Sequence, residues 1–283
     1  MKAYTQLQKA PEIFDPVTGA VLKALWFRPR FPPGKARRLN WLERLLGHKR
    51  IVTHTRSGFR FACDQTDWLQ RNLLCNGIHE PEITQLLESE LQPSDVFYDI
   101  GANSGYFSLL AATMGVGFVI GFEPDPESCT VFRLNRKLNG WGNEKITLKQ
   151  VALSDRSGRA AFQRASDSGD GGFGQWPHRE TVEEVTVDVA TLDSLWRDEG
   201  VPLPTVIKLD VEGWEHPVFA GARDLLENHP PRLLIFETAC GRDGTISDTR
   251  LPVMLTQYGF CITRVERPSG VIKPTENYVA RQI

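Results

Sequence analysis

The sequence predicts a doubly wound α/β fold, in which helices cover both faces of a mostly parallel sheet. Short apolar segments have the length and composition of strands, namely residues 96–100, 118–122, 146–153, 206–211, 233–237, 260–265 and 278–282. Other segments have apolar residues at helical spacing and alternate with these strands, namely 81–91, 106–114, 128–138 and about 212–227. Such alternation is typical of parallel sheets, because a parallel connection crosses the sheet as a helix.

Local signals justify individual elements. Pro81 suits the first turn of its helix, because an amide hydrogen would have no partner there. After the third strand the pattern becomes strictly alternating, at 159–163 and 185–189, which is typical of half-exposed strands in a hairpin. A polar, glycine-rich stretch at 164–179 lies between them and predicts either a mobile loop or a lid over a bound ligand.

The composition excludes several classes of protein. The chain has 33 basic and 35 acidic residues among 283, whereas a dedicated nucleic-acid binder carries a large basic excess. Its five cysteines form no C-x-x-C pair and are odd in number, which disfavours a secreted disulfide scaffold. No apolar run reaches the roughly 18 residues of a membrane span. We therefore expect a cytoplasmic protein with neither a nucleic-acid partner nor a membrane span.

Small and acidic residues follow the strand at 96–100. Asp99 precedes a turn bounded by Gly101 and Gly105, where missing side chains let a ligand approach the backbone. Glu123 ends the next strand, and a carboxylate at this point can accept hydrogen bonds from both hydroxyls of a ribose. Because ligands of doubly wound folds bind at the carboxyl ends of the strands, the sequence predicts a nucleoside site here.

The charge at this turn discriminates between nucleosides. A dinucleotide site places pyrophosphate on a G-x-G-x-x-G turn, whereas the spacing here is G-x-x-x-G, with Asp99 two residues before the first glycine. A carboxylate would repel a phosphate but attracts a cation. We therefore predict S-adenosyl-L-methionine, a nucleoside with a positively charged amino-acid tail, as the cofactor. An NAD(P)-dependent oxidoreductase is the alternative.

Ordered motifs make the chain similar to the FkbM family of S-adenosylmethionine-dependent methyltransferases. The matching stretches are VFYDIGANSGYFSLLAA, VIGFEPDPESCTVFRLNRKLNG, ITLKQVALSDRSG, ATLDSL, VIKLDVEGWEHPVFAGA and RLLIFE. Upstream, Glu80-Pro81-Glu82 resembles the acidic-proline element of that family. The resemblance covers about residues 58–283. It implies a Rossmann-like, class I methyltransferase fold with a seven-stranded sheet, a β-hairpin insertion and an N-terminal extension.

The resemblance also implies roles for individual cofactor-site residues. The positions that would line the methionine part of the cofactor lie in one turn, and they are Asp99, Gly101, Ala102, Asn103 and Gly105. The positions that would contact the nucleoside lie at the next two strand ends, with Glu123 and Pro124 at the ribose and Ala152, Leu153 and Ser154 at the adenine.

Acidic residues also gather where the fourth strand ends. Asp210 shares a strand face with Lys208, and Glu237 ends the following strand. A hydroxyl acceptor must lose its proton, which calls for a general base. The candidates are Asp210, Glu212, His216 and Glu237, among which the sequence does not choose. We expect Asp210 to contact the acceptor or the cofactor, and we expect no metal because no metal-ligand spacing is evident.

Together these features predict an S-adenosylmethionine-dependent O-methyltransferase of natural-product biosynthesis. The resemblance implies that its acceptor is a hydroxyl of a small metabolite such as a sugar, a glycoside or a polyketide-like compound. A non-catalytic nucleoside-binding protein on the same fold is a second alternative. We expect the methyltransferase domain at 80–283 and an N-terminal extension at 1–79 that helps to close the acceptor pocket.

Overall fold

The structure is a computed structural model that describes residues 50–64, 70, 73–74, 76–165, 181–267 and 270–283. Two units divide the chain, residues 1–79 and residues 80–283. In chain order the described elements are β1 Arg50–His54, β2 Arg60–Asp64, α4 Pro81–Glu90, β3 Val96–Ile100, α5 Tyr106–Thr113, β4 Phe118–Phe122, α6 Pro126–Leu138, β5 Ile146–Lys149, β6 Ala152–Leu153, β7 Gly158–Ala165, β8 Thr181–Ala190, α7 Leu192–Glu199, β9 Val206–Leu209, α8 Glu215–Ala220, α9 Arg223–Asn228, β10 Leu233–Ala239, α10 Arg250–Gln257, β11 Phe260–Arg264 and β12 Thr275–Gln282.

The first unit contains an antiparallel hairpin of β1 and β2. The sequence analysis assigned no strand to this segment, so the hairpin is a feature that it missed. Thr55 closes the hairpin by donating its amide to the carbonyl of Phe59 at 2.9 Å, and Gly58 supplies the positive φ of 97° that the loop requires. In β1 the buried residues Ile51 and Thr53 alternate with more exposed ones, whereas Phe61, Ala62 and Cys63 of β2 are all buried.

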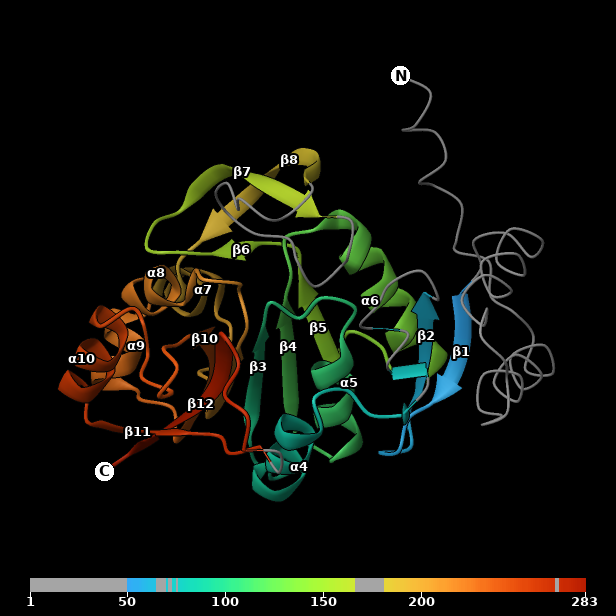
Figure 1. Cartoon of the computed structure of the whole chain (residues 1–283). Helices are drawn as coiled ribbons and strands as arrows, with labels where there is room; N and C mark the ends of the chain where they lie inside the picture. Colours follow the sequence, from blue (N-terminus) through green and yellow to red (C-terminus); the bar gives the residue numbers. More distant parts are fainter. Residues whose placement is uncertain (1–49, 65–69, 71–72, 75, 166–180, 268–269) are drawn as a thin grey trace. The chain divides into compact units, whose positions relative to one another are not determined.

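A seven-stranded sheet forms the centre of the second unit, in the order β11-β12-β10-β9-β3-β4-β5 (Figure 1). The pairs among β10, β9, β3, β4 and β5 are parallel, and β12 runs antiparallel to both of its neighbours. Strand order reverses at β3, since β4 lies on one side of it and β9 on the other. The doubly wound fold and its seven strands are thus confirmed, and the β3–β9 border is the switch point at which such folds bind ligands.

Helices cover the two faces of this sheet. Tyr98 and Ile100 of β3 point to one face, where they belong to a core that includes Val218 and Phe219 of α8 and Leu251 of α10. Because side chains alternate along a strand, Asp99 points to the opposite face. Figure 1 shows α5 and α6 beside β3–β5, and α8, α9 and α10 grouped around β10 and β11.

A second sheet, of order β6-β8-β7, contains the predicted hairpin insertion. β7 and β8 pair antiparallel along their length, whereas β6 pairs parallel with the end of β8. The third strand was predicted to run to Leu153, but it leaves the main sheet after Lys149 and resumes at Ala152 in this second sheet. Apolar residues resume at Val151, Ala152 and Leu153 directly after the break, so the composition alone did not reveal it.

One helix prediction needs correction, and two helices were missed. The helix predicted to reach Glu227 is two helices, α8 and α9, separated at Gly221. A Cβ at Gly221 would lie 2.0 Å from the carbonyl oxygen of Ser154, so only glycine fits there. The helices α7 and α10 were not predicted, although Gly200 ends α7 with a φ of 65° and Leu251 and Leu255 are buried one turn apart on α10.

Some expectations fall outside the described residues, including the lid proposed for 164–179, of which only Arg164 and Ala165 are described. Within the described ranges, every helix is too short or too polar to traverse a lipid bilayer.

Candidate functional site

The turn after β3 is held against the end of β4. The amides of Gly101 and Ala102 both donate to the carbonyl oxygen of Phe122, at 3.0 Å each. Gly101, Asn103 and Gly105 all have positive φ values, of 75°, 49° and 91°, so the chain reverses within five residues. Gly105 is the N-cap of α5. This geometry leaves the backbone of 101–105 without bulky side chains at the switch point of the sheet.

Gly101 also lies against the neighbouring strand end. A Cβ at this position would lie 1.7 Å from the carbonyl oxygen of Asp210, directly after β9. The amide of Asp210 in turn donates to the carbonyl of Ile100 at 2.9 Å. The turn after β3 and the end of β9 therefore form one closely packed backbone layer.

Asp99 is completely buried at the end of β3. One carboxylate oxygen, Oδ2, accepts a hydrogen bond from the hydroxyl of Ser108 at 2.7 Å. The other, Oδ1, is buried and has no hydrogen-bond partner among the described residues. Burial raises the pKa of this carboxyl, although Lys208 opposes the rise. An orphaned buried carboxylate oxygen of this kind suits a positively charged ligand.

Glu123 lies at the end of β4 with 6% of its surface exposed. Its Oε2 accepts from the amide of Asn103 and its Oε1 from the amide of Asp125, each at 2.8 Å. Since each carboxylate oxygen has two lone pairs, each retains one acceptor site for a ligand hydroxyl. Burial raises the pKa of Glu123 to about 7, because the two amide hydrogen bonds only partly offset the loss of solvation.

Lys208 brings a buried positive charge to the switch point. It is the register partner of Asp99 on β9, and only 3% of its surface is exposed. Its ammonium donates to Asp210 Oδ2 at 2.9 Å and lies 4.7 Å from the ring centroid of Phe107. Burial alone would lower the pKa of Lys208, but Asp210, Asp99 and Glu80 outweigh burial and raise it.

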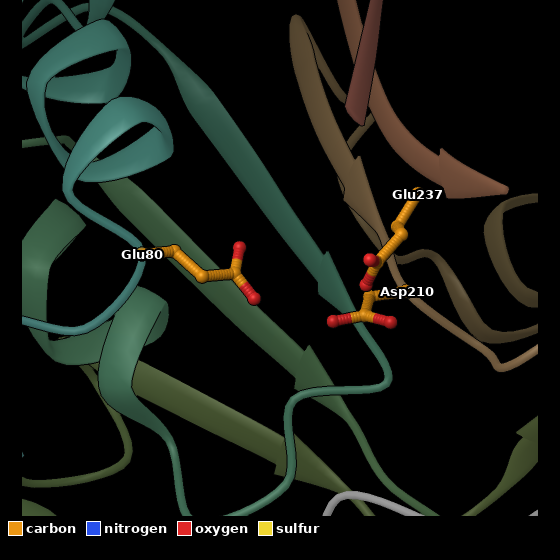
Figure 2. Close-up of side chains that lie close together, drawn as sticks. All are labelled: Glu80, Asp210 and Glu237. Atoms are coloured by element: carbon orange, nitrogen blue, oxygen red, sulfur yellow. The ribbon is translucent and has the colours of Figure 1, made fainter. Parts of the chain in front are cut away.

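Three carboxylates meet beside this lysine. Glu80, Asp210 and Glu237 each place a carboxylate oxygen within 4.8 Å of the others. Figure 2 shows Glu80 reaching from the chain before α4 toward Asp210, directly after β9, and Glu237, within the neighbouring strand β10. Burial raises the pKa of Glu237 to about 7, with further contributions from Asp210 and Glu80. Burial likewise raises the pKa of Glu80 to about 7, against the opposing charge of Lys208.

The sequence did not predict Glu80 as a site residue. It lies 130 residues before Asp210 in the chain, outside any strand, and only the fold brings the two together. Its backbone has a φ of 39°, which is uncommon for a residue with a side chain. The Glu-Pro-Glu element was the available signal, since Pro81 fixes the start of α4 directly after Glu80.

The other candidate bases lie apart from this carboxylate cluster. Glu212 follows β9 with a φ of 52° and does not belong to the cluster. His216 is half-buried on α8. The pKa of Asp248 is lowered mainly by hydrogen bonds from Arg250 and slightly by His216, so the imidazole lies near Asp248.

The predicted adenine-side residues are buried together at the start of the second sheet. Ala152, Leu153 and Ser154 are each less than 5% exposed. The Ser154 hydroxyl accepts from Trp214 Nε1 and donates to Asp155 Oδ1, at 3.1 Å each. Pro124 is half-buried between Glu123 and Asp125. Ser154 thus joins the predicted adenine side to the loop after β9.

Comparison with known proteins places the chain in a family. The model of the methyltransferase FkbM domain matches residues 99–260, which is more than half of the chain and includes both Asp99 and Glu237. The chain belongs to the FkbM methyltransferase family. The resemblance seen in the sequence motifs is thereby confirmed. Glu80 of this FkbM-family protein lies outside the matched region.

Individual relatives of this FkbM-family protein are methyltransferases. It is 30% identical over 150 residues to the hexuronic acid methyltransferase AglP of Haloferax volcanii, which covers 53% of this chain and 59% of AglP. It is 27% identical over 166 residues to the 2-O-methyltransferase NoeI of Sinorhizobium fredii, covering 51% of this chain and 63% of NoeI. The 31-O-demethyl-FK506 methyltransferase FkbM of Streptomyces tacrolimicus is 26% identical over 210 residues, which cover 63% of this chain and 77% of that protein.

The matched region therefore spans less than two thirds of AglP and of NoeI. Among solved structures, the methyltransferase FkbM from Methylobacillus flagellatus is 19% identical, with a TM-score of 0.48 over 68% of this chain and 45% of that chain.

Proposed function

We propose that the chain is an S-adenosylmethionine-dependent O-methyltransferase that acts on a hydroxyl of a small metabolite. Membership of the FkbM family supports methyl transfer. Relatives named for a hexuronic acid, a 2-O position and a 31-O position of FK506 support an oxygen acceptor on a sugar or polyketide-like compound.

The observation that carries the proposal is the pair of buried acids around the turn after β3. The orphaned Oδ1 of Asp99 fits the positively charged end of the cofactor, and the spare lone pairs of Glu123 fit the two ribose hydroxyls. Gly101 and Gly105 leave the backbone between them open to close approach. The residues present therefore fit S-adenosylmethionine at the ends of β3 and β4.

When bound, this cofactor supplies a methyl group on a positively charged sulfur. The chain has two tasks beside it, to hold the acceptor in line with the methyl group and to take the proton of the acceptor hydroxyl. Positioning of this kind can supply roughly 7 to 11 kcal/mol of the barrier in favourable systems. Asp99 and Glu123 fix the cofactor, and the carboxylate cluster of Glu80, Asp210 and Glu237 faces the acceptor in this proposal.

We assign the proton acceptor to Glu237, with Glu80 as its neighbour in the cluster. A general base works best when its pKa lies near the working pH, and the pKa of each of these two carboxyls is about 7. Asp210 is engaged by the buried ammonium of Lys208 at 2.9 Å, and its removal would leave that ammonium without this hydrogen bond. We therefore propose that Asp210 contacts the acceptor or cofactor but does not remove the proton.

Calorimetric titration tests the proposal directly. We expect the protein to bind S-adenosylhomocysteine, the product of methyl transfer, and to bind NAD⁺ weakly or not at all. A preference for NAD⁺ would instead support an oxidoreductase. Mass spectrometry of hydroxylated sugars, glycosides and macrolides incubated with isotopically labelled cofactor then identifies the acceptor. Cofactor binding without labelling of any compound in this panel would favour a non-catalytic nucleoside-binding protein.

Replacing Glu123 by alanine is expected to weaken S-adenosylhomocysteine binding at least about tenfold, which corresponds to about 1.4 kcal/mol. The substitution removes the acceptor of both ribose hydroxyls. The dissociation constant from calorimetry measures the effect, and Glu227→Ala, which removes an exposed carboxylate on α9, is the matched control. An unchanged affinity in a folded Glu123→Ala protein would mean that the ribose lies elsewhere.

The affinity for S-adenosylhomocysteine is expected to rise with pH. Ribose hydroxyls donate to the ionised carboxylate, so binding favours the deprotonated form of Glu123, whose pKa is about 7. Going from pH 8 to pH 6 should therefore weaken binding about tenfold. Titrations across this range measure the trend. The Glu123→Ala protein should have lost it, and an equal trend in both proteins would assign the proton to another group.

Turnover is expected to survive removal of divalent cations. The carboxylate cluster is compact enough to hold a metal ion, but the Lys208 ammonium already supplies a positive charge beside Asp210. Dialysis against EDTA should leave the rate of methyl transfer unchanged. A loss of activity that Mg²⁺ restores would instead assign a metal to Glu80, Asp210 and Glu237.

A further inference from the structure

Arg164 connects the hairpin insertion with the start of α6. Arg164 lies near the end of β7, and only 19% of its side chain is exposed. Its guanidinium forms ion pairs with Asp125 at 2.6 Å and with Glu183 of β8 at 2.8 Å, and it also contacts Glu127 in the first turn of α6. The sequence placed this residue in a polar loop, whereas it gathers three carboxylates from two parts of the fold.

Asp125 connects this ion cluster to the proposed ribose site. Its Oδ2 accepts the amide of Ser128 at 2.8 Å and so caps α6. Its own amide donates to Glu123 Oε1 at 2.8 Å. The carbonyl of Glu123 accepts from the thiol of Cys129 on the same helix. A continuous chain of polar contacts therefore runs from Arg164 through Asp125 to the carboxylate of Glu123.

The carboxylates of this cluster need the positive charge of Arg164 as a counter-ion. Asp125 is only 9% exposed, and Glu127, Glu183 and Glu123 are further acids nearby. Burial would lower the pKa of Arg164, but the three paired carboxylates outweigh burial and raise it. Without the guanidinium, Asp125 would lose its counter-ion and would be repelled by neighbouring acids. Its cap on α6 and its hydrogen bond to Glu123 would then no longer be fixed.

We propose that Arg164 is a positioning residue for the nucleoside, which holds Asp125 and thereby orients the Glu123 carboxylate toward the ribose. This inference rests on the proposed function and deepens it. It makes the β7–β8 insertion part of the cofactor site, although no residue of the insertion was assigned to the cofactor from the sequence. It predicts that loss of Arg164 reduces specifically the affinity that depends on the ribose hydroxyls.

The test compares two nucleosides in Arg164→Ala. We expect the affinity for S-adenosylhomocysteine to fall about fivefold or more, and that for its 2′,3′-dideoxy analogue, which has no hydroxyls for Glu123, to change less than about twofold. Arg164→Lys should restore part of the affinity, because it keeps the positive charge. The matched control is Arg159→Ala on the same strand, since the ion pair that Arg159 makes with Asp188 is exposed, at 70% and 72% of the two side chains.

The outcomes separate this inference from the proposed function. Equal losses for both nucleosides, or no loss for either, in folded Arg164→Ala would overturn the positioning role alone. If Arg164→Ala unfolds at the assay temperature, the same comparison in Arg164→Lys decides, because lysine lacks the guanidinium fork and should still weaken the ribose-dependent part. Failure of the unmodified protein to bind S-adenosylhomocysteine would overturn the proposed function itself.

Discussion

Glu237→Gln is expected to lower the rate of methyl transfer about 100-fold while the affinity for S-adenosylhomocysteine changes less than about twofold. Glutamine keeps the size of the side chain but cannot accept a proton. The proposed base lies in the cluster that faces the acceptor, and Asp99 and Glu123, which hold the cofactor, are unchanged. Turnover with the acceptor identified by mass spectrometry measures the first quantity, and calorimetry measures the second.

The pH profile distinguishes loss of a base from loss of a contact. The carboxyl of Glu237 must be ionised to take a proton, and its pKa is about 7, so turnover of the unmodified protein should rise as the pH increases through 7. This rise should be lost in Glu237→Gln. Glu80→Gln should lower turnover less than Glu237→Gln, and Glu227→Gln on α9 should leave it unchanged. Normal turnover in Glu237→Gln would remove this residue from the mechanism.

Gly101→Ala is expected to lower the free energy of unfolding by more than about 3 kcal/mol, the largest loss of stability among the variants proposed. The new Cβ would lie 1.7 Å from the carbonyl oxygen of Asp210, a backbone atom that cannot move without displacing the end of β9. Placing alanine at a φ of 75° adds about 1–2 kcal/mol. Thermal unfolding measures the effect, which corresponds to a fall in Tm of roughly 6–12 °C.

Gly115→Ala is the matched control for this prediction. Gly115 follows α5 with a φ of 84°, and a Cβ there would meet no atom within 4 Å. Both substitutions therefore incur the cost of a positive φ, and only Gly101→Ala incurs the clash. A difference in Tm between the two variants isolates the packing of the turn against β9. Equal falls in Tm would contradict that close packing.

The strands at the centre of the fold were predictable because both of their faces are buried. The segments Val96–Ile100 and Phe118–Phe122 are apolar throughout except at Asp99, and their observed bounds equal the predicted ones. Asp99 itself was recognisable because it lies two residues before the first glycine of the turn, where a carboxylate attracts a cation. The acids at the strand ends could also be placed, since parallel strands of such a fold present their carboxyl ends on one side.

The residues whose place in the fold the sequence did not predict are positioned by contacts between distant segments. Glu80 precedes a helix, and no local pattern connects it with Asp210 or Glu237. Arg164 stands next to a glycine-rich stretch, so its local composition indicates a loop, whereas its partner Asp125 lies 39 residues earlier in the chain. Long-range ion pairs of this kind leave no periodic signal.

A crystal structure with bound S-adenosylhomocysteine tests the account most directly. The account predicts the nucleoside at the carboxyl ends of β3 and β4, with both ribose hydroxyls within hydrogen-bonding distance of Glu123 and the amino-acid end beside Asp99. Density for the nucleoside at any other surface, or none at these strand ends under saturating ligand, would contradict it.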